Sequence, residues 1–281
     1  MPPEPRVPTV ISIAGSDSGG GAGIQADLKA FAHCGVHGMT AITALTAQNT
    51  VGVEAVLPTP PEMIVAQVHA VASDIGIDAV KIGMLCDEAT IDAVIESLGV
   101  IEKYRRGAPV VLDPVMVAES GAALLDPDAK AALIERLLPL VTVVTPNLPE
   151  ARELAGRREG GTQRELAEAI LGLGPDAVIV TGGHTEKGAD VLVDANGYLE
   201  IEGPRFADGA AHGSGCTHSS AVAALLARGM ELDEAARWAR EIAAEAVGHG
   251  LREIGEGPGP VDVLRIRRRE IDPPSAPPAD H

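Results

Sequence analysis

The stretch Val10-Ile11-Ser12-Ile13-Ala14-Gly15-Ser16-Asp17-Ser18-Gly19-Gly20-Gly21-Ala22-Gly23-Ile24-Gln25-Ala26-Asp27-Leu28 joins an apolar run to a helical pattern through a loop dense in glycine. Apolar runs of this length, rich in β-branched residues, predict buried strands. The same order of strand and helix recurs along the chain. Strands are predicted at 10–14, 79–82, 110–112, 141–145 and 177–180, and helices at 61–75, 89–98, 128–138 and 163–171.

This alternation predicts βαβ units and therefore an α/β fold, in which helices flank a mostly parallel central sheet as three layers. Two segments interrupt it. Residues 40–56 have the pattern of consecutive short strands, which fits either two ordinary strands of the sheet or a flap over a pocket. Residues 191–201 predict a hairpin around Asn196-Gly197 with a type I′ turn, at an antiparallel edge of the sheet.

The composition supports one large core. Of 281 residues, 46% are hydrophobic but only 2% are aromatic, so Ala, Val, Ile and Leu must fill the interior, as in a sheet buried on both faces. We expect a single domain at 9–264. Residues 1–8 carry four prolines and no apolar core, so they are neither a signal peptide nor a membrane anchor. We expect disorder at 1–8 and in the proline-rich tail at 265–281.

The charge limits the partners of this protein. Its formal net charge is -18, and a surface this negative repels nucleic acid and anionic lipid, so neither is an expected partner. Cys34, Cys86 and Cys216 are too few and too scattered for a disulfide framework or a metal cluster, which fits a reducing cytoplasm. An anionic substrate would therefore need local positive potential within the site.

The first glycine loop contains Gly19-x-Gly21-x-Gly23 directly after the first predicted strand. A dinucleotide-binding fingerprint would have different glycine spacing and an acidic residue after the next strand, and both are missing here. A flexible strand-to-helix turn is the plain alternative. The density of glycine favours a functional interpretation, because it lets the backbone approach a ligand closely.

The second glycine loop is His212-Gly213-Ser214-Gly215-Cys216-Thr217, which opens a predicted helix. Amides at a helix N-terminus point outward unpaired and bind anions, which would supply the positive potential that an acidic protein needs. Catalysis of phosphoryl transfer depends mostly on positioning and on stabilising charge. A plain helix start is equally consistent with this loop alone.

Two further groups of polar residues follow predicted strands. Asp113 ends one strand, and Asn147 and Glu150 follow another; their oxygens suit Mg²⁺, although the spacing of Asn147 and Glu150 by itself favours a helix capping box. Thr181-Gly182-Gly183-His184 follows the strand at 177–180 and could hold a nucleotide phosphate. Ligands of parallel sheets bind beyond the carboxyl ends of the strands, where all these residues lie.

Together these motifs resemble the hydroxymethylpyrimidine/phosphomethylpyrimidine kinases of thiamine biosynthesis, members of the ribokinase-like superfamily. The similarity extends from Val10 to Leu264. It rests, in this order, on Ala-Gly-Ser-Asp-Ser-Gly-Gly-Gly-Ala-Gly-Ile-Gln-Ala-Asp-Leu-Lys at 14–29, Thr-Ala-Gln-Asn-Thr at 46–50, Lys-Ile-Gly-Met at 81–84, Val-Leu-Asp-Pro-Val-Met at 111–116, Thr-Pro-Asn-Leu-Pro-Glu-Ala at 145–151 and His-Gly-Ser-Gly-Cys-Thr at 212–217.

The resemblance implies a ribokinase-like fold and ATP-dependent phosphorylation of 4-amino-5-hydroxymethyl-2-methylpyrimidine and of its monophosphate, in a homodimer. Gln48 corresponds to the glutamine that reads the pyrimidine in this family. A neutral amide offers both a carbonyl to the exocyclic amine and an N–H to a ring nitrogen, which a carboxylate cannot do. The resemblance implies that the pocket walls are Ala22, Asp27, Met84 and Val115.

The same resemblance implies a site for ATP and Mg²⁺. It assigns Asn147 and Glu150 to an Asn-x-x-Glu magnesium motif, in which Asn147 also contacts ATP, and it adds the Asp113 carboxylate. Thr181, Gly182 and Gly183 would contact ATP. Many relatives have lysine at the position of Thr181, so a cation that contacts phosphate is missing here, which bears on the second phosphorylation.

Cys216 stands where sugar kinases of the superfamily have an aspartate base. We hypothesise that Cys216 accepts the proton of the substrate hydroxyl while the amides of Gly213, Ser214 and Gly215 hold the phosphoryl group. A helix N-terminus lowers a thiol pKa and a bound phosphate raises it, so the sequence leaves the net direction open. A small buried hydrophobic residue is the plain alternative. The rival functions are a pyridoxal kinase on the same scaffold and a non-catalytic pyrimidine sensor.

Overall fold

A computed structural model describes residues 6–117, 121, 124–157, 159–183, 188–206 and 209–268 of the chain. Ten strands lie in these residues, eight of them in one sheet. They are β1 (Thr9–Ala14), β2 (His37–Ile42), β3 (Ala44–Gln48), β4 (Val53–Pro58), β5 (Ala79–Ile82), β6 (Val110–Leu112), β7 (Val143–Val144), β8 (Ala177–Val180), β9 (Asp190–Asp194) and β10 (Gly197–Ile201).

The central sheet has the strand order β10-β9-β8-β7-β6-β5-β1-β2. From β8 to β2 every neighbouring pair is parallel, and β9 and β10 add an antiparallel edge. This confirms the predicted sheet. The predicted strand at 141–145 is too long, because the amide of Val141 still donates to Leu138 O as the chain leaves the preceding turn.

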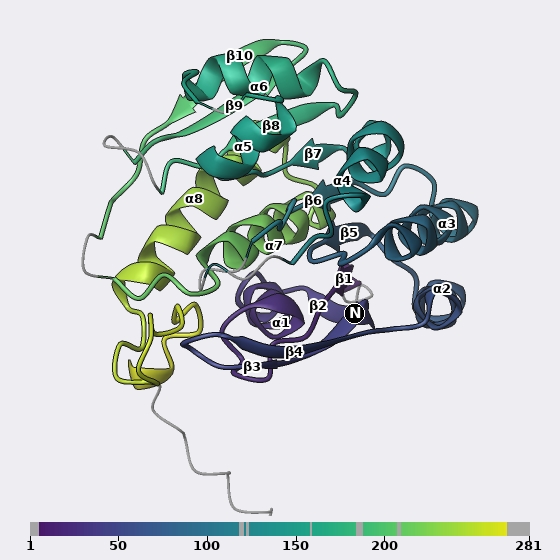
Figure 1. The fold of residues 1–281 in the computed structure, drawn as a ribbon, viewed down its shortest axis with the longest axis horizontal. Coiled ribbons are helices and arrows are strands. Elements are labelled where there is room, and N and C mark those ends of the chain that lie inside the picture. Colours follow the sequence, from purple (N-terminus) through teal and green to yellow (C-terminus); the bar gives the residue numbers. More distant parts are fainter. Residues whose placement is uncertain are drawn as a thin grey trace, which may run out of the picture.

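Helices cover both faces of this sheet (Figure 1). They are α1 (Gly23–His33), α2 (Pro61–Asp74), α3 (Glu88–Tyr104), α4 (Ala129–Ala132), α5 (Leu148–Leu154), α6 (Gln163–Leu171), α7 (Ser214–Ala227) and α8 (Leu232–Gly248), with short helical turns η1 (Leu133–Leu137), η2 (Leu138–Leu140) and η3 (Ile266–Arg268). None of the helices in the described residues is long and apolar enough to cross a membrane.

Side chains alternate across the strands and so build two cores. In β8, Val178 and Val180 belong to one core cluster, which also contains residues of α2, α3, α5 and α6, whereas Ala177 and Ile179 belong to a second cluster, which contains residues of α1, α7 and α8. Successive side chains of a strand point to opposite faces, so a strand buried on both sides is mostly apolar. The three-layer α/β architecture predicted from the sequence is confirmed.

Two predicted helices differ from the observed ones. α3 continues through Gly99 to Tyr104, because Ile101 extends its buried stripe, so the predicted end at residue 98 is wrong. The predicted helix at 128–138 is divided into α4, η1 and η2, the last of which contains Pro139. Proline lacks the N–H that an α-helix needs, which explains the irregular end.

The segment 40–56 contributes to one strand of the central sheet and to two strands that lie outside it. β2 joins the edge of the central sheet beside β1, whereas β3 and β4 form a separate two-stranded antiparallel sheet. The predicted hairpin at 191–201 is confirmed, but its type I′ turn is wrong. The turn residues are Ala195 and Asn196, neither of which has a positive φ. The Asp194 carboxylate accepts the amide of Asn196 at 2.7 Å, a local contact that favours this turn.

Most of the segments predicted to be disordered lie outside the described residues. Of these segments, 6–8 and 265–268 are described, and Arg6 lies 3.2 Å from the Asp78 carboxylate.

Candidate functional site

The two glycine loops, far apart in sequence, pack directly on each other. Gly213 caps α7 with φ 84°, and a Cβ atom at this position would lie 1.8 Å from Gly21 O. A Cβ at Gly21 would in turn overlap the ring of His212. Only glycine fits at both positions, so the density of glycine serves a close backbone approach, as the functional interpretation required.

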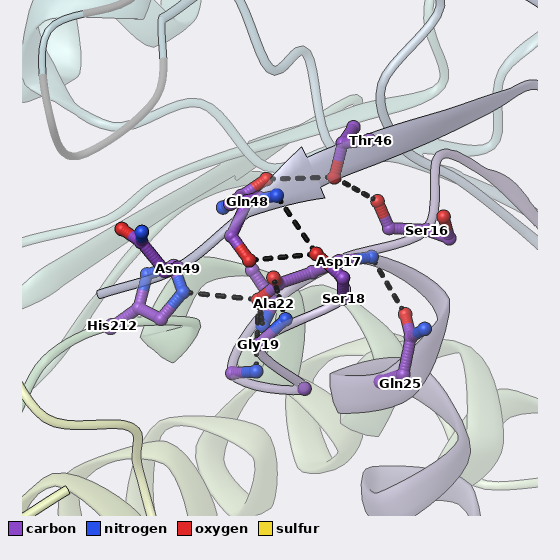
Figure 2. A network of polar contacts seen from close by, with 12 residues as sticks. Ser16, Asp17, Ser18, Gly19, Ala22, Gln25, Thr46, Gln48, Asn49 and His212 are labelled. Atoms are coloured by element: carbon purple, nitrogen blue, oxygen red, sulfur yellow. Dashed lines mark hydrogen bonds and ion pairs between the residues drawn. The ribbon is translucent and has the colours of Figure 1, made fainter. Parts of the chain in front are cut away.

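Asp17 holds this arrangement together (Figure 2). Its Oδ2 accepts the amides of Gly21 at 2.9 Å and Ala22 at 2.8 Å, and its Oδ1 accepts the amide of Gly19 at 2.8 Å. His212 Nε2 lies 3.1 Å from Oδ2, across 195 positions of sequence. Burial by itself would raise the pKa of Asp17, but these hydrogen bonds outweigh it and lower the pKa below its usual value.

The sequence did not assign Asp17 a role, although it stands within the quoted loop. The available signal was an aspartate followed by a run of glycines, because a short carboxylate can accept the amides that follow it in the chain.

The first turn of α7 leaves amides available at its N-terminus. The amides of Ser214 and Thr217 donate to Ala211 O and Gly213 O, whereas those of Gly215 and Cys216 donate to no backbone carbonyl outside the helix among the described residues. Gly215 is exposed and Cys216 half-buried. This is the geometry expected for an anion-binding helix start.

The Cys216 thiol is more basic than a free thiol. Burial raises its pKa to about 12; Lys81 opposes this rise, and the carboxylates of Asp113 and Asp27 add to it. The direction that the sequence left open is therefore upward in this structure, and the thiol is protonated at neutral pH.

Asp27 does not line an open pocket, which corrects its predicted place in the pocket wall. Its carboxylate has no exposed surface, and both oxygens lie 2.9 Å from Lys81 Nζ, itself fully buried. The hydroxyls of Ser12 and Ser220 donate to the same carboxylate at 2.5 and 2.7 Å. A charge can be buried this deeply because it is paired and hydrogen-bonded.

Lys81 is a charged residue of the site that sequence reasoning missed. Burial by itself would lower its pKa, but the negative charge of Asp27 raises it above the usual lysine value. The ammonium thus stays charged beneath the start of α7. Lys81 lies within the quoted Lys-Ile-Gly-Met motif. A lysine inside an otherwise apolar predicted strand was the sequence signal for a buried charge.

The capping box that the spacing favoured is present. Asn147 Oδ1 accepts the amide of Glu150 at 2.9 Å, and Glu150 Oε2 accepts the amide of Asn147 at 2.9 Å. Burial and then the charge of Asp113 raise the pKa of Glu150 to about 8. Burial also raises the pKa of Asp113, which accepts the Ser219 hydroxyl at 3.1 Å. The two carboxylates are therefore close enough to repel each other.

These residues fit a magnesium ion. No cluster of three or more His, Cys, Asp or Glu side chains suited to a metal occurs in the part of the chain described. Mg²⁺ needs no such cage, since it usually takes one or two carboxylates and fills its other positions with water and phosphate. A divalent cation would also relieve the repulsion between Asp113 and Glu150.

Gln48 lies at the end of β3, where a bulge interrupts pairing with β4. The Ser18 hydroxyl bridges the backbone of Gln48, donating to its carbonyl at 2.7 Å and accepting its amide at 2.8 Å (Figure 2). Gln48 Oε1 accepts the Thr46 hydroxyl at 3.4 Å, and no hydrogen bond from Nε2 is found among the described residues. The first glycine loop therefore fixes the backbone that presents this amide.

The other predicted wall residues surround the same loops. Ala22 precedes α1 and donates to Asp17. Met84 is almost buried, and its sulfur lies 3.0 Å from where a Cβ at Gly15 would be. Val115 is half-buried and donates its amide to Asp113 O at 2.8 Å, next to the carboxylate pair.

The predicted nucleotide segment follows β8. The amide of Thr181 donates to Pro146 O at 2.9 Å, which brings this segment beside Asn147. The amide of Gly182 donates to Asp190 Oδ1 at 2.7 Å, and Gly183 is exposed. His184 lies outside the described residues. The structure thus brings the predicted ATP-contacting residues together beyond the carboxyl ends of β7 and β8.

Known proteins are similar to this chain over most of its length. A family model described as phosphomethylpyrimidine kinase matches residues 17–262. A hydroxymethylpyrimidine/phosphomethylpyrimidine kinase of Rhizobium meliloti (strain 1021) is 50% identical over 257 residues, which cover 89% of this chain and 95% of that protein.

Two solved structures are also similar. The phosphomethylpyrimidine kinase of Clostridium difficile 630 is 41% identical with a TM-score of 0.74, covering 86% of this chain and 100% of the other. An ADP complex of Bacillus subtilis pyridoxal kinase is 38% identical with a TM-score of 0.83, covering 94% of this chain and 100% of the other.

The fold and the paired glycine loops define a small-molecule kinase of the ribokinase-like class, a phosphotransferase that acts on an alcohol group. The chain belongs to the phosphomethylpyrimidine kinase family. The resemblance inferred from the six motifs is confirmed.

Proposed function

We propose that this protein uses ATP to phosphorylate 4-amino-5-hydroxymethyl-2-methylpyrimidine and then its monophosphate. The observation that carries this proposal is the packing of Gly213 on Gly21, with Ser18 bonded to Gln48. These contacts link the anion-binding start of α7 to the amide proposed to read the pyrimidine. The Rhizobium meliloti relative, named for the same two substrates, supports it.

Each group of residues in the site has its own proposed role in the reaction. Gln48 orients the pyrimidine, while Ala22, Met84 and Val115 enclose it. The amides of Gly213, Ser214 and Gly215 hold the transferring phosphoryl group, which is electrostatic stabilisation by preorganised donors. Thr181, Gly182, Gly183 and Asn147 hold the nucleotide. Asp27 acts from within the core by fixing Lys81.

Asp113 and Glu150 would hold Mg²⁺, which, when bound, neutralises charge that develops on the phosphates. Replacing Glu150 with Gln should raise the magnesium concentration needed for half-maximal activity, because the ion loses a charged ligand. A Glu150→Gln variant with an unchanged magnesium requirement would argue against this role.

Cys216 is proposed to accept the proton of the substrate hydroxyl. Only the thiolate form of Cys216 can accept this proton and so become the thiol, and Lys81 is the charge that favours the thiolate. General bases typically contribute about 10² to 10⁴ in rate. We therefore expect Cys216→Ala to lower kcat at least about 100-fold in steady-state assays. A kcat near that of the wild type would reduce the thiol to a positioning role.

The decisive experiment measures ADP release with the pyrimidine alcohol, its monophosphate and pyridoxal offered in parallel. We expect turnover of the alcohol and of the monophosphate. The second step is the sharper test, because Thr181 stands where many relatives have a lysine that contacts phosphate. Turnover of the alcohol alone would restrict the proposal to the first phosphorylation.

A pyridoxal kinase is the second candidate, favoured by the TM-score of 0.83 to the Bacillus subtilis pyridoxal kinase. A preference for pyridoxal in the same assay would select it. A sensor is the third candidate, and binding of the pyrimidine without turnover would select that.

We also propose that the protein acts as a homodimer in the cytoplasm. Leu45 pairs with Leu57 across β3 and β4, and they are 51% and 66% exposed. A two-stranded sheet is marginally stable alone, so covering this apolar face would stabilise it. The free thiols of Cys34, Cys86 and Cys216 fit a reducing compartment. Light scattering on wild type and Leu57→Glu tests the dimer, which should dissociate in the variant; a monomeric wild type would refute it.

A further inference from the structure

A buried charged cluster lies behind the nucleotide segment and is not explained by the chemistry described so far. Asp190 at the start of β9, His218 in α7 and Arg240 in α8 are all more than nine-tenths buried. His218 Nε2 lies 3.2 Å from Asp190 Oδ2, and Arg240 Nε lies 3.5 Å from Asp190 Oδ1. Burying such groups is costly, and Asp190 Oδ2, both His218 ring nitrogens and Arg240 Nε have no hydrogen-bond partner among the described residues, so the short distances between the three side chains are the contacts that hold them.

Asp190 holds the nucleotide segment. Its Oδ1 accepts the amide of Gly182 at 2.7 Å, immediately after β8 ends. A Cβ at Gly182 would overlap Ala189 O, so the segment runs directly against the start of β9. The backbone of Gly182 is therefore fixed from two sides, by a hydrogen bond and by close contact.

Arg240 binds the chain just before β9 and just after β10. Its guanidinium donates to Gly188 O at 2.7 Å and to Pro204 O at 3.1 Å. Arginine suits this role because its planar fork presents several donors in fixed directions. Gly188 lies two residues before β9, so Arg240 anchors the start of β9 to α8.

His218 joins this cluster to the catalytic loop. It follows Cys216 by two residues on α7, and the next residue, Ser219, donates to Asp113 Oδ2 at 3.1 Å. The same turn of α7 thus contacts Asp190 on one side and the proposed magnesium carboxylate on the other. A shift of α7 relative to β9 would break one of these contacts.

We propose that Asp190, His218 and Arg240 act as positioning residues that fix the nucleotide-binding segment Thr181-Gly182-Gly183 relative to the start of α7. The proposal rests on the proposed role of that segment in binding ATP. The three residues touch neither the nucleotide nor the pyrimidine; they act through the Gly182 amide. Changing them should alter nucleotide affinity and leave pyrimidine affinity unchanged.

The test compares Asp190→Ala with Asp190→Asn by calorimetric titration with ADP and, separately, with the pyrimidine alcohol. Alanine removes the acceptor of the Gly182 amide, whereas asparagine keeps a carbonyl oxygen for it and loses only the charge. We expect Asp190→Ala to raise the Kd for ADP about tenfold and Asp190→Asn to restore most of the affinity. The Kd for the pyrimidine should stay at the wild-type value in both.

Asp194→Asn is the matched control, because Asp194 lies on the same strand but its carboxylate, within the described part of the chain, accepts hydrogen bonds only from Asn196 in the turn. It should bind ADP as the wild type does. If Asp190→Ala does not fold, Arg240→Lys serves instead: it keeps a positive charge but removes the Nη2 group that donates to Gly188 O and Pro204 O, so the Kd for ADP should rise and the Kd for the pyrimidine should not.

The proposal is overturned if the two Asp190 variants bind ADP equally, if ADP affinity does not change in Arg240→Lys, or if ADP and pyrimidine affinities fall together. ADP titration does not require pyrimidine turnover. A wild type that binds ADP but fails to phosphorylate the pyrimidine would therefore count against the proposed function and leave this proposal to be judged on its own result.

Discussion

Gly213→Ala is the substitution that most directly tests the packing of the two glycine loops. Gly213 and Gly229 stand at opposite ends of α7, and both have φ 84°. A side chain at either position costs about 1 to 2 kcal/mol of left-handed backbone strain. Only Gly213 meets another loop, since nothing lies within 4 Å of a Cβ at Gly229. Gly229→Ala is therefore a control for the strain alone.

The added cost at Gly213 follows from distance. Its Cβ would lie 1.8 Å from Gly21 O, and ordinary contact begins at 3.4 Å, so the loops must separate by about 1.6 Å. A displacement of about 1 Å in a catalytic site can cost about 100-fold in rate. We therefore expect Gly213→Ala to lower kcat/KM at least about 100-fold. Gly229→Ala should keep kcat/KM near the wild-type value while losing similar backbone stability.

The assay pairs steady-state kinetics with urea denaturation of both variants, so that lost activity is compared at known stability. Equal kcat/KM in the two variants would refute the reasoning, because it would mean that the contact between Gly213 and Gly21 contributes nothing beyond backbone strain.

Three further predictions concern buried charges and the nucleotide segment. Asp17→Asn should lower the free energy of unfolding by about 2 kcal/mol at pH 7. Folding lowers the pKa of Asp17, so its stabilisation is present above the unfolded value of 3.8 and is lost as pH falls through the folded pKa; a difference from wild type that stays constant below pH 4 would contradict this. Lys81→Met should cost about 3 to 5 kcal/mol in urea denaturation, because Asp27 stays buried without its partner. The double variant Lys81→Met/Asp27→Leu should recover most of that loss, and a double variant no more stable than the single one would refute the pairing. Thr181→Lys should raise kcat/KM for the monophosphate more than for the alcohol, and an equal rise for both would show that the lysine does not act on the second phosphate.

Much of the fold and part of the site follow from local patterns. The strands at 79–82, 110–112 and 177–180 agree with the observed β5, β6 and β8, because a strand buried on both faces is mostly apolar, with Lys81 the one exception in these three strands. The capping box at Asn147 and Glu150 was visible from their spacing, since helix capping involves residues three positions apart.

The errors came where distant segments decide the outcome. Asp27 was predicted in the pocket wall from its place in a motif, but its partner Lys81 stands 54 positions away on the strand beneath it. The role of Asp17 depends partly on His212, which is 195 positions distant. Neither pairing leaves a periodic signal, because hydrogen bonds across a fold depend on which strands become neighbours.

The amino-acid sequence by itself determined most of the strands and helices and the helix start that can bind an anion, because each depends on residues close together in the chain. Only the tertiary structure decided the state of the site. It raised the pKa of the Cys216 thiol and joined Gly182 to α7 through Asp190 and His218. Burial and the distances between charges produce these effects, and both exist only after the sheet has brought its loops together.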